Sequence, residues 1–299
     1  MLRLLDTNKR DYQRHPVLVY IHGESYEWNS GNPYDGSVLA AYGRVVVVTV
    51  NFRLGVLGFL NTNENPYLRS ITNYGLMDQI AALHWLKENI AEFGGDADNV
   101  TIFGHGTGAA CINFLMTSKA VPKMYDRVLT RPRVCSQQRL GCVHGEELPY
   151  VWGAPLVDTL SYFPINYTQP EVKLAEAMLT YWTNFARTGN PNEPTNQSSD
   201  RVSEKNRFRT LEWPPYDGMH RKYIDIDLKP RVKDHYRSHQ LSFWLQLIPQ
   251  LHLAGKDAPE AHHHLENHND WNSYRGYVRS EPVTRYRGPL GRGAGEECQ

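Results

Sequence analysis

Three glycines within five residues, Gly104, Gly106 and Gly108, separate two apolar segments of this chain. Residues 100–103 are rich in β-branched and aromatic side chains, which is typical of a buried strand, and residues 109–116 have the composition of a helix. Glycine tolerates the left-handed backbone of a tight turn and allows two segments to approach closely. The sequence therefore predicts a sharp strand–turn–helix junction at residues 104–108.

These five residues have the frame Gly-x-Ser-x-Gly with a glycine at the central position. In enzymes that use this turn, the nucleophile elbow, the central serine attacks an ester carbonyl through its side-chain oxygen. Gly106 has no side chain and supplies no nucleophile. The glycines alone also fit an ordinary turn between a strand and a helix. They fit as well a phosphate-binding loop, in which Gly104, Gly106 and a helix N-terminus hold an anion.

Predicted strands and helices alternate in the chain before this turn. Residues 17–21 and 45–50 are apolar runs of strand type, and the first is followed by His22, Gly23, Glu24 and Ser25. A helix between them and the glycine turn is indicated by apolar residues at helical spacing: Leu76, Ile80, Leu83 and Leu86. This alternation predicts an α/β fold with a mostly parallel sheet.

Longer motifs carry a resemblance to a known family. They are residues 104–108, 150–155, 181–191 and 228–237. In these motifs the chain resembles the carboxylesterase type B family, which contains cholinesterases and non-enzymatic relatives, and within it the neuroligins, in an invertebrate form. The resemblance covers residues 16–124 and 135–253 and implies an α/β-hydrolase, cholinesterase-like sheet with flanking helices.

The resemblance assigns roles to individual positions. Gly106 falls at the catalytic serine and His144 at the catalytic histidine, which therefore has no nucleophile to activate. Gly23, Glu24 and Thr107 fall at the oxyanion loop. A carboxylate at position 24 would oppose a developing negative charge, unless the side chain points away and leaves only its amide inward. We therefore expect these positions to be degenerate and the protein to be no enzyme.

Two alternatives remain open. One is a carboxylic-ester hydrolase of the same family with a non-standard nucleophile, for which Thr107 and Ser25 are the nearby candidates. The other is a truncated product that does not fold alone, because loss of interior strands exposes the edges of a sheet.

Compared with a full-length member of the family, the predicted domain at residues 16–253 is incomplete. We expect the N-terminal hairpin to be missing, and also a large segment between residues 124 and 135 that carries the acid of the triad. Residues 254–299 have no apolar periodicity, which predicts a disordered, stalk-like tail. The tail contains His262, His263, His264 and His268, but a flexible segment lacks the fixed geometry of a specific site. The sequence predicts no metal and no cofactor.

Charge and hydropathy exclude further classes. The formal net charge is +0, which gives no indication of nucleic-acid binding. The mean hydropathy is −0.56, and we expect neither a membrane span nor a signal peptide in this form. Neuroligins ordinarily have both and act on the extracellular side of the plasma membrane at synapses. The resemblance gives that location for the family, and the location of this form stays open.

The resemblance also implies partners. Neuroligins bind neurexins across synapses in a calcium-dependent way, with the calcium at the partner interface. Family members form homodimers through a C-terminal helix, predicted here at residues 230–248 with the candidate contacts Tyr236, Phe243, Trp244 and Leu247. The helix that would pair with it falls in the missing segment, which argues against a homodimer of this form.

The remaining expectations concern one more helix, the cysteines and the glycosylation motifs. A helix at residues 171–188, ending at Gly189, carries a core-facing set: Leu174, Met178, Tyr181, Trp182 and Phe185. Cys111 is expected to be buried, while the pairing of Cys135, Cys142 and Cys298 stays open. Asn166 and Asn196 are the predicted glycosylation acceptors, and Asn99, at a strand entrance, is a chance match to the motif.

Overall fold

The computed structural model describes residues 2–3, 14–61, 72–121, 125–130, 134–135, 144–157, 163, 166–192 and 211–254. The chain divides into two compact units, Met1–Tyr236 and Arg237–Gln299. The predicted tail at 254–299 lies outside the described residues apart from residue 254, as do Cys142, Cys298 and Asn196.

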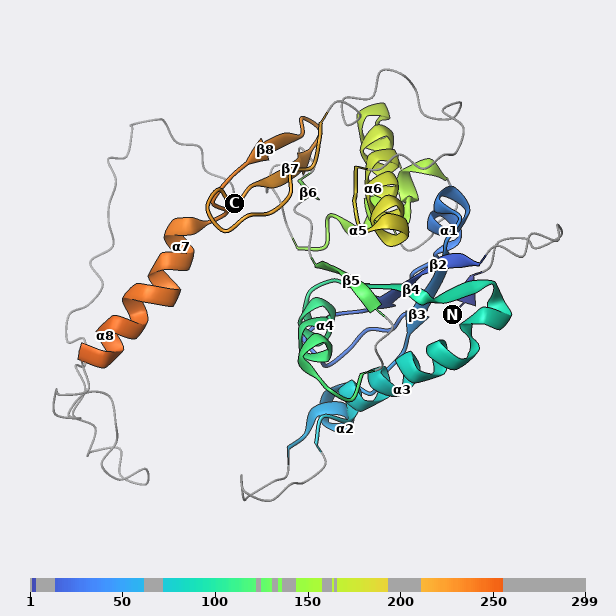
Figure 1. Cartoon of the computed structure of the whole chain (residues 1–299), viewed down its shortest axis with the longest axis horizontal. Helices are drawn as coiled ribbons and strands as arrows, with labels where there is room; N and C mark the ends of the chain where they lie inside the picture. Colours follow the sequence, from blue (N-terminus) through green and yellow to red (C-terminus); the bar gives the residue numbers. More distant parts are fainter. Residues whose placement is uncertain are drawn as a thin grey trace, which may run out of the picture. The chain divides into compact units, whose positions relative to one another are not determined.

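A five-stranded sheet forms the centre of the first unit (Figure 1). Its order is β1 (Leu2–Arg3), β3 (Val46–Val50), β2 (His15–Ile21), β4 (Gly95–Gly104) and β5 (Tyr125–Thr130). β1 is antiparallel to β3, and the other neighbours are parallel. Because Ile21 pairs with Gly104, the segments that follow β2 and β4 begin side by side, at the carboxyl ends of these two strands.

Helices cover both faces of this sheet (Figure 1). One face packs on α3 (Tyr74–Asn89), which continues into the 3-10 turn η1 (Ile90–Phe93), and on α4 (Thr107–Thr117). The other face packs on α1 (Ser37–Gly43), α5 (Leu148–Trp152), η2 (Ala154–Leu156) and α6 (Gln169–Thr188). Successive residues of β2 enter opposite cores, since Val17 and Val19 belong to the first and Leu18 and Tyr20 to the second. The predicted α/β class is confirmed.

The ends of α6 agree with its sequence. Thr168 and Glu171 form a capping box, with the Glu171 carboxylate accepting hydrogen bonds from the Thr168 amide and hydroxyl, both at 2.7 Å. Gly189 ends the helix with a left-handed φ of 82°. The predicted core-facing set is buried in the structure, apart from Phe185, which is partly exposed.

A small second sheet has the order β6 (Val134–Cys135), β7 (Tyr223–Asp227) and β8 (Arg231–Lys233). The helix predicted at residues 230–248 is therefore wrong at its start. Residues 231–233 pair antiparallel with β7, where Ile224 lies opposite Val232, and Pro230 lies in the connection between the strands. Ile224 and Ile226 are buried in the core of the unit, so tertiary packing overrides the local helical pattern.

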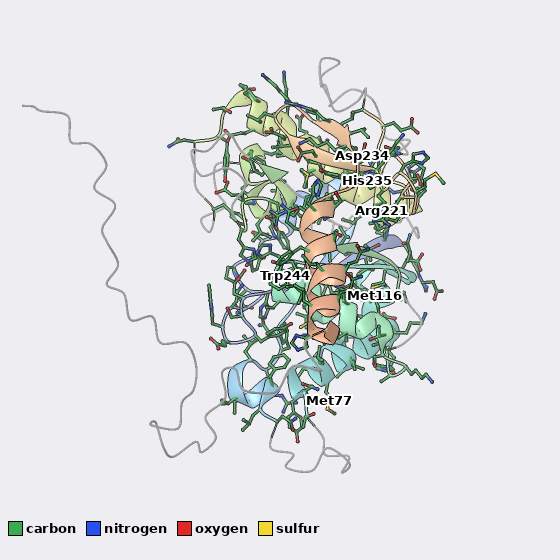
Figure 2. The ribbon with its side chains drawn as sticks, turned by 90° about the vertical axis from the view of Figure 1, so that its left-hand side faces the viewer. Met77, Met116, Arg221, Asp234, His235 and Trp244 are labelled. Atoms are coloured by element: carbon green, nitrogen blue, oxygen red, sulfur yellow. The ribbon has the colours of Figure 1, made fainter. Side chains whose placement is uncertain are left out.

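The second unit contains a helical run made of α7 (Ser238–Ser242), η4 (Phe243–Leu247) and α8 (Ile248–Ala254). Phe243, Trp244 and Leu247 lie on this run and are exposed, and Trp244 is labelled in Figure 2. Tyr236 precedes the helix and packs edge-on against Tyr223 of β7, with ring centroids 5.3 Å apart. Tyr236 thus belongs to the first unit, and the other three dimer candidates belong to the second.

Candidate functional site

The predicted strand–turn–helix junction is present at the carboxyl end of β4, an interior strand of the sheet. Gly106 precedes α4 with φ 56° and ψ −124°, a backbone conformation that residues with a side chain rarely adopt. A Cβ atom on Gly108 would lie 2.1 Å from the Ile21 carbonyl oxygen, so glycine is needed where the start of α4 approaches β2. The elbow backbone is therefore that of a nucleophile turn, and it carries no nucleophilic side chain at position 106.

The loop after β2 lies against this elbow. A Cβ atom on Gly23 would lie 2.4 Å from the His105 carbonyl oxygen and 3.0 Å from the Thr107 amide nitrogen. His22, before it, is buried and stacks on Phe52 with ring centroids 4.4 Å apart. Burial lowers the pKa of His22 to about 4, so this ring is neutral near neutral pH. The oxyanion-loop residues named from the sequence, Gly23, Glu24 and Thr107, thus lie around Gly106.

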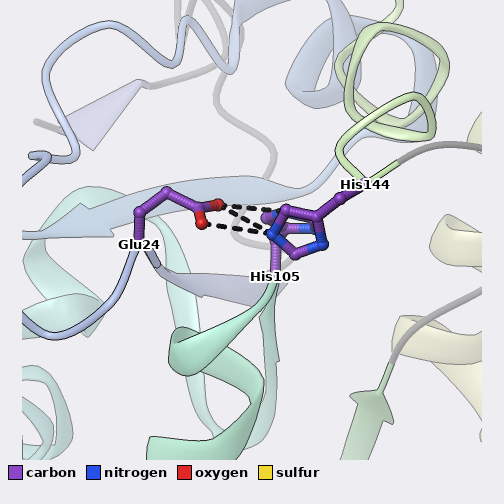
Figure 3. Close-up of side chains that lie close together, drawn as sticks. All are labelled: Glu24, His105 and His144. Atoms are coloured by element: carbon purple, nitrogen blue, oxygen red, sulfur yellow. Dashed lines mark hydrogen bonds and ion pairs between the residues drawn. The ribbon is translucent and has the colours of Figure 1, made fainter. Parts of the chain in front are cut away.

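Glu24 points its carboxylate into the site. Its two oxygens lie 3.2 and 3.1 Å from His144 Nε2, and one of them lies 3.1 Å from His105 Nε2 (Figure 3). The sequence left open whether this side chain turns away, and the structure places it beside the elbow. A carboxylate here opposes the oxyanion of an acyl-transfer intermediate.

His144 lies over the elbow from the opposite side. A Cβ atom on Gly106 would be 3.3 Å from its Nε2 atom. The side chain of His144 is 50% exposed, so solvent reaches the site from this direction. Gly106 and His144 are therefore neighbours in space, although 38 positions separate them in the chain.

Two further residues of the site were not predicted from the sequence. His105 is buried, and its Nδ1 atom lies 2.5 Å from Oε1 of the buried Glu147, while its Nε2 atom lies 3.0 Å from His144 Nε2. The available signal was the ionisable residue His105 between two elbow glycines, together with Glu147 three positions after His144.

The pKa of Glu147 depends on its burial and on His105. Burial alone would raise the pKa of this carboxyl, but the hydrogen bond and the charge of His105 outweigh burial and hold the pKa below its ordinary value. Glu147 is therefore an anion near neutral pH and accepts the Nδ1–H of His105. This bond places a proton on Nδ1 of His105.

The candidate non-standard nucleophiles are less well placed. Ser25 is an exposed loop residue with φ 54°, and Thr107 is the first residue of α4. Within the residues that the structure describes, neither hydroxyl hydrogen-bonds either histidine, whereas Ser and Thr nucleophiles rely on contact with an adjacent base.

A glycine-lined elbow after an interior strand of a mostly parallel sheet, with a histidine across from it, defines an α/β-hydrolase type of protein. A thermophilic pNB esterase shares this fold with a TM-score of 0.63 and 20% sequence identity, over 80% of this chain and 81% of the esterase. Residues 5–131 and 123–244 match the model of the carboxylesterase family, and the chain belongs to that family.

Neuroligins are among its relatives. Mouse neuroligin-2 is 28% identical over 445 aligned positions that include 83% of this chain and 53% of the relative. Human neuroligin-3 is 26% identical, with 83% of this chain and 52% of the relative covered. A stretch of 110 residues is 44% identical to neuroligin-3 of Macaca mulatta, over 36% of this chain and 54% of the relative.

The chain spans about half the length of neuroligin-2 and neuroligin-3 from mouse and human. The alignment with mouse neuroligin-2 has 445 positions, more than the 299 residues of this chain, so it contains long gaps on the side of this chain. The predicted boundaries of the missing segment, at residues 124 and 135, stay a prediction.

Predictions were also made for a cysteine, for the glycosylation motifs and for membrane-spanning segments. Cys111 is a buried free thiol on α4, as expected for a small apolar residue there. Asn166 is exposed with a left-handed φ of 80°, and Asn99 lies within β4. No helix in the described part of the chain is long and apolar enough to cross a membrane.

Proposed function

We propose that this chain is a non-catalytic, cholinesterase-like adhesion domain of neuroligin type that binds a neurexin-like cell-surface protein at synapses. The observation that carries the proposal is Gly106. The elbow keeps the backbone of a nucleophile turn while the position of the nucleophile has no side chain.

The contacts of His144 also support a non-catalytic role. Its Nε2 atom, the atom that faces Gly106, is engaged by the Glu24 carboxylate and by His105. A general base needs a nucleophile within hydrogen-bond reach and a third group that orients its other ring nitrogen. In this site the contacting groups are themselves ionisable, and the negative charge of Glu24 disfavours an oxyanion.

The kind of partner comes from the similarity to neuroligin-2 and neuroligin-3. By this similarity the domain acts on the extracellular side of the plasma membrane, and calcium belongs to the interface with the partner. Phe243, Trp244 and Leu247, exposed on a helical run, have the apolar character of a helix that dimerises in relatives. We do not expect this homodimer in the present form, because the helix that would pair with residues 230–248 falls in the segment predicted to be missing.

Binding and turnover test the proposal separately. Purified chain is passed over an immobilised neurexin ectodomain with calcium and then with EDTA, and the same preparation is assayed for hydrolysis of a small aryl ester. We expect calcium-dependent, saturable binding and no turnover. Saturable turnover that disappears in His144→Ala would contradict the non-catalytic assignment. Equal signals with calcium and with EDTA would contradict the adhesion assignment.

A further inference from the structure

We propose that Glu24, His105 and His144 form a binding site for one divalent transition-metal ion, of which zinc is the representative, beside the empty side-chain position of Gly106. The three residues come from the loop after β2, the elbow after β4 and the segment before α5, and their donor atoms converge (Figure 3). The proposal is independent of the adhesion function.

The distances between the donor atoms fit a metal site. His105 Nε2 and His144 Nε2 are 3.0 Å apart, and Glu24 oxygens lie 3.1 Å from each of them. Zinc bonds of about 2.0–2.1 Å in a tetrahedron place neighbouring ligand atoms about 3.3 Å apart. A small outward movement of the exposed His144 and of Glu24 therefore admits the ion without a change in the fold.

Protons alone satisfy this cluster poorly. With a single proton, donated from Nδ1 to Glu147, the ring of His105 would have a lone pair at Nε2, and an ionised Glu24 offers only lone pairs. If His144 Nε2 carries a proton, His105 Nε2 and Glu24 still meet as two acceptors. A second proton, at His105 Nε2, gives Glu24 a donor. It also brings the N–H groups of His105 and His144 face to face, with their nitrogen atoms 3.0 Å apart. A cation that accepts a lone pair from each residue satisfies all three.

Glu147 has the position of a supporting carboxylate. Metal-binding histidines commonly donate their second ring nitrogen to a carboxylate, which fixes the tautomer and makes the ligand more basic. The bond from His105 Nδ1 to Glu147 Oε1 is 2.5 Å long, and both side chains are buried. His105 is thus held with Nε2 directed at Glu24 and His144.

Gly106 leaves room on the open side of the cluster. A Cβ atom there would lie 3.3 Å from His144 Nε2 and 3.5 Å from Glu24 Oε1. With three protein ligands and the half-exposed ring of His144, water can complete the coordination, as in zinc sites with two histidines and one glutamate. Two nitrogen ligands among three favour zinc, copper, nickel or cobalt over calcium, which takes oxygen ligands.

The test is a zinc titration followed by calorimetry. It uses a parent chain with the substitutions His262→Gln, His263→Gln, His264→Gln and His268→Gln, so that metal bound by these histidines is removed from the signal. We expect one zinc per chain, a higher unfolding temperature with zinc, and a visible absorption band when cobalt is bound instead. Absence of saturable binding by this parent to zinc, cobalt, nickel and copper would overturn the proposal.

Variants of the parent identify the residues. His144→Ala and Glu24→Gln should each lower zinc affinity by at least tenfold and abolish the temperature shift. Glu147→Gln should weaken binding by about 10–100-fold through His105, the usual cost of losing such a support. The control is His84→Ala, an exposed histidine on α3 whose ring contacts the Ala120 carbonyl, and it should bind as the parent does. Circular dichroism checks that His144→Ala and Glu24→Gln are folded. If the folded variants bind zinc as tightly as the parent does, the assignment is wrong.

Discussion

Replacement of Gly106 by alanine should destabilise the protein through the backbone of the elbow. At φ 56° and ψ −124°, a residue with a side chain is strained by about 1–3 kcal/mol. The new Cβ would also lie 3.3 Å from the His144 ring, a tight contact that this half-exposed ring can relieve by shifting. We therefore expect Gly106→Ala to lower the free energy of unfolding by about 1–3 kcal/mol, nearly all of it backbone strain.

Urea denaturation measures this difference, with tryptophan fluorescence and circular dichroism as two probes. Gly218→Ala is the matched control, because a Cβ atom there meets nothing within 4 Å and its φ lies outside the left-handed range. The control should be unchanged or stabilised by about 0.4–1 kcal/mol, since alanine restricts the unfolded chain. If Gly106→Ala unfolds at the same or a higher urea concentration than the parent, with the same slope, the elbow is not strained and its assignment as a nucleophile turn fails.

Three further predictions concern the same fold. Gly106→Ser should not hydrolyse p-nitrophenyl acetate faster than the parent does, because Glu24 and His105 already engage the Nε2 atom of His144. Steady, saturable turnover in a spectrophotometric assay would show that a serine at position 106 is sufficient for hydrolysis. Gly108→Ala should lower the free energy of unfolding by about 1–3 kcal/mol or more, since its Cβ would lie 2.1 Å from the Ile21 carbonyl oxygen; a urea midpoint equal to that of the parent would refute the close approach. Asp78→Asn should unfold at lower urea than the parent at pH 7, and the difference should shrink as the pH falls below the unfolded pKa of aspartate. The hydrogen bond from Arg53 outweighs burial and lowers the pKa of Asp78, so its stabilisation is present above the unfolded pKa and lost as the pH falls through the folded one.

Local patterns in the sequence were sufficient for much of the fold. The strands at residues 17–21 and 45–50, the glycine turn and the helix that ends at Gly189 each follow from a few consecutive residues with one periodicity. The helix start at Pro230 was wrong because residues 231–233 pair with β7. The next residues do form a helical run, from Ser238 onward.

The site could be predicted only in part. A resemblance gave Gly106, Glu24 and His144 their predicted roles, and the structure brings these three residues together. His105 was missed because its partner Glu147 is 42 positions away and no local pattern joins them. The direction of Glu24 depends on how the loop after β2 meets the elbow, which is decided by close approaches at Gly23 and Gly108. Such contacts are properties of the folded chain rather than of either segment.

Glycine at position 106 lowers the backbone strain of the elbow and leaves space beside Glu24 and His144. In a serine hydrolase the strain of this turn is borne by the residue that must present its oxygen, whereas glycine adopts the same backbone with little strain. The space freed at the turn lies within 3.5 Å of Glu24 and His144, and the carboxylate and the two imidazoles meet beside it. A serine mechanism at this elbow would therefore require at least three changes: a serine that bears the strain, a loop without the charge of Glu24, and a ring nitrogen of His144 released from His105. A single reversion at Gly106 makes only the first of these.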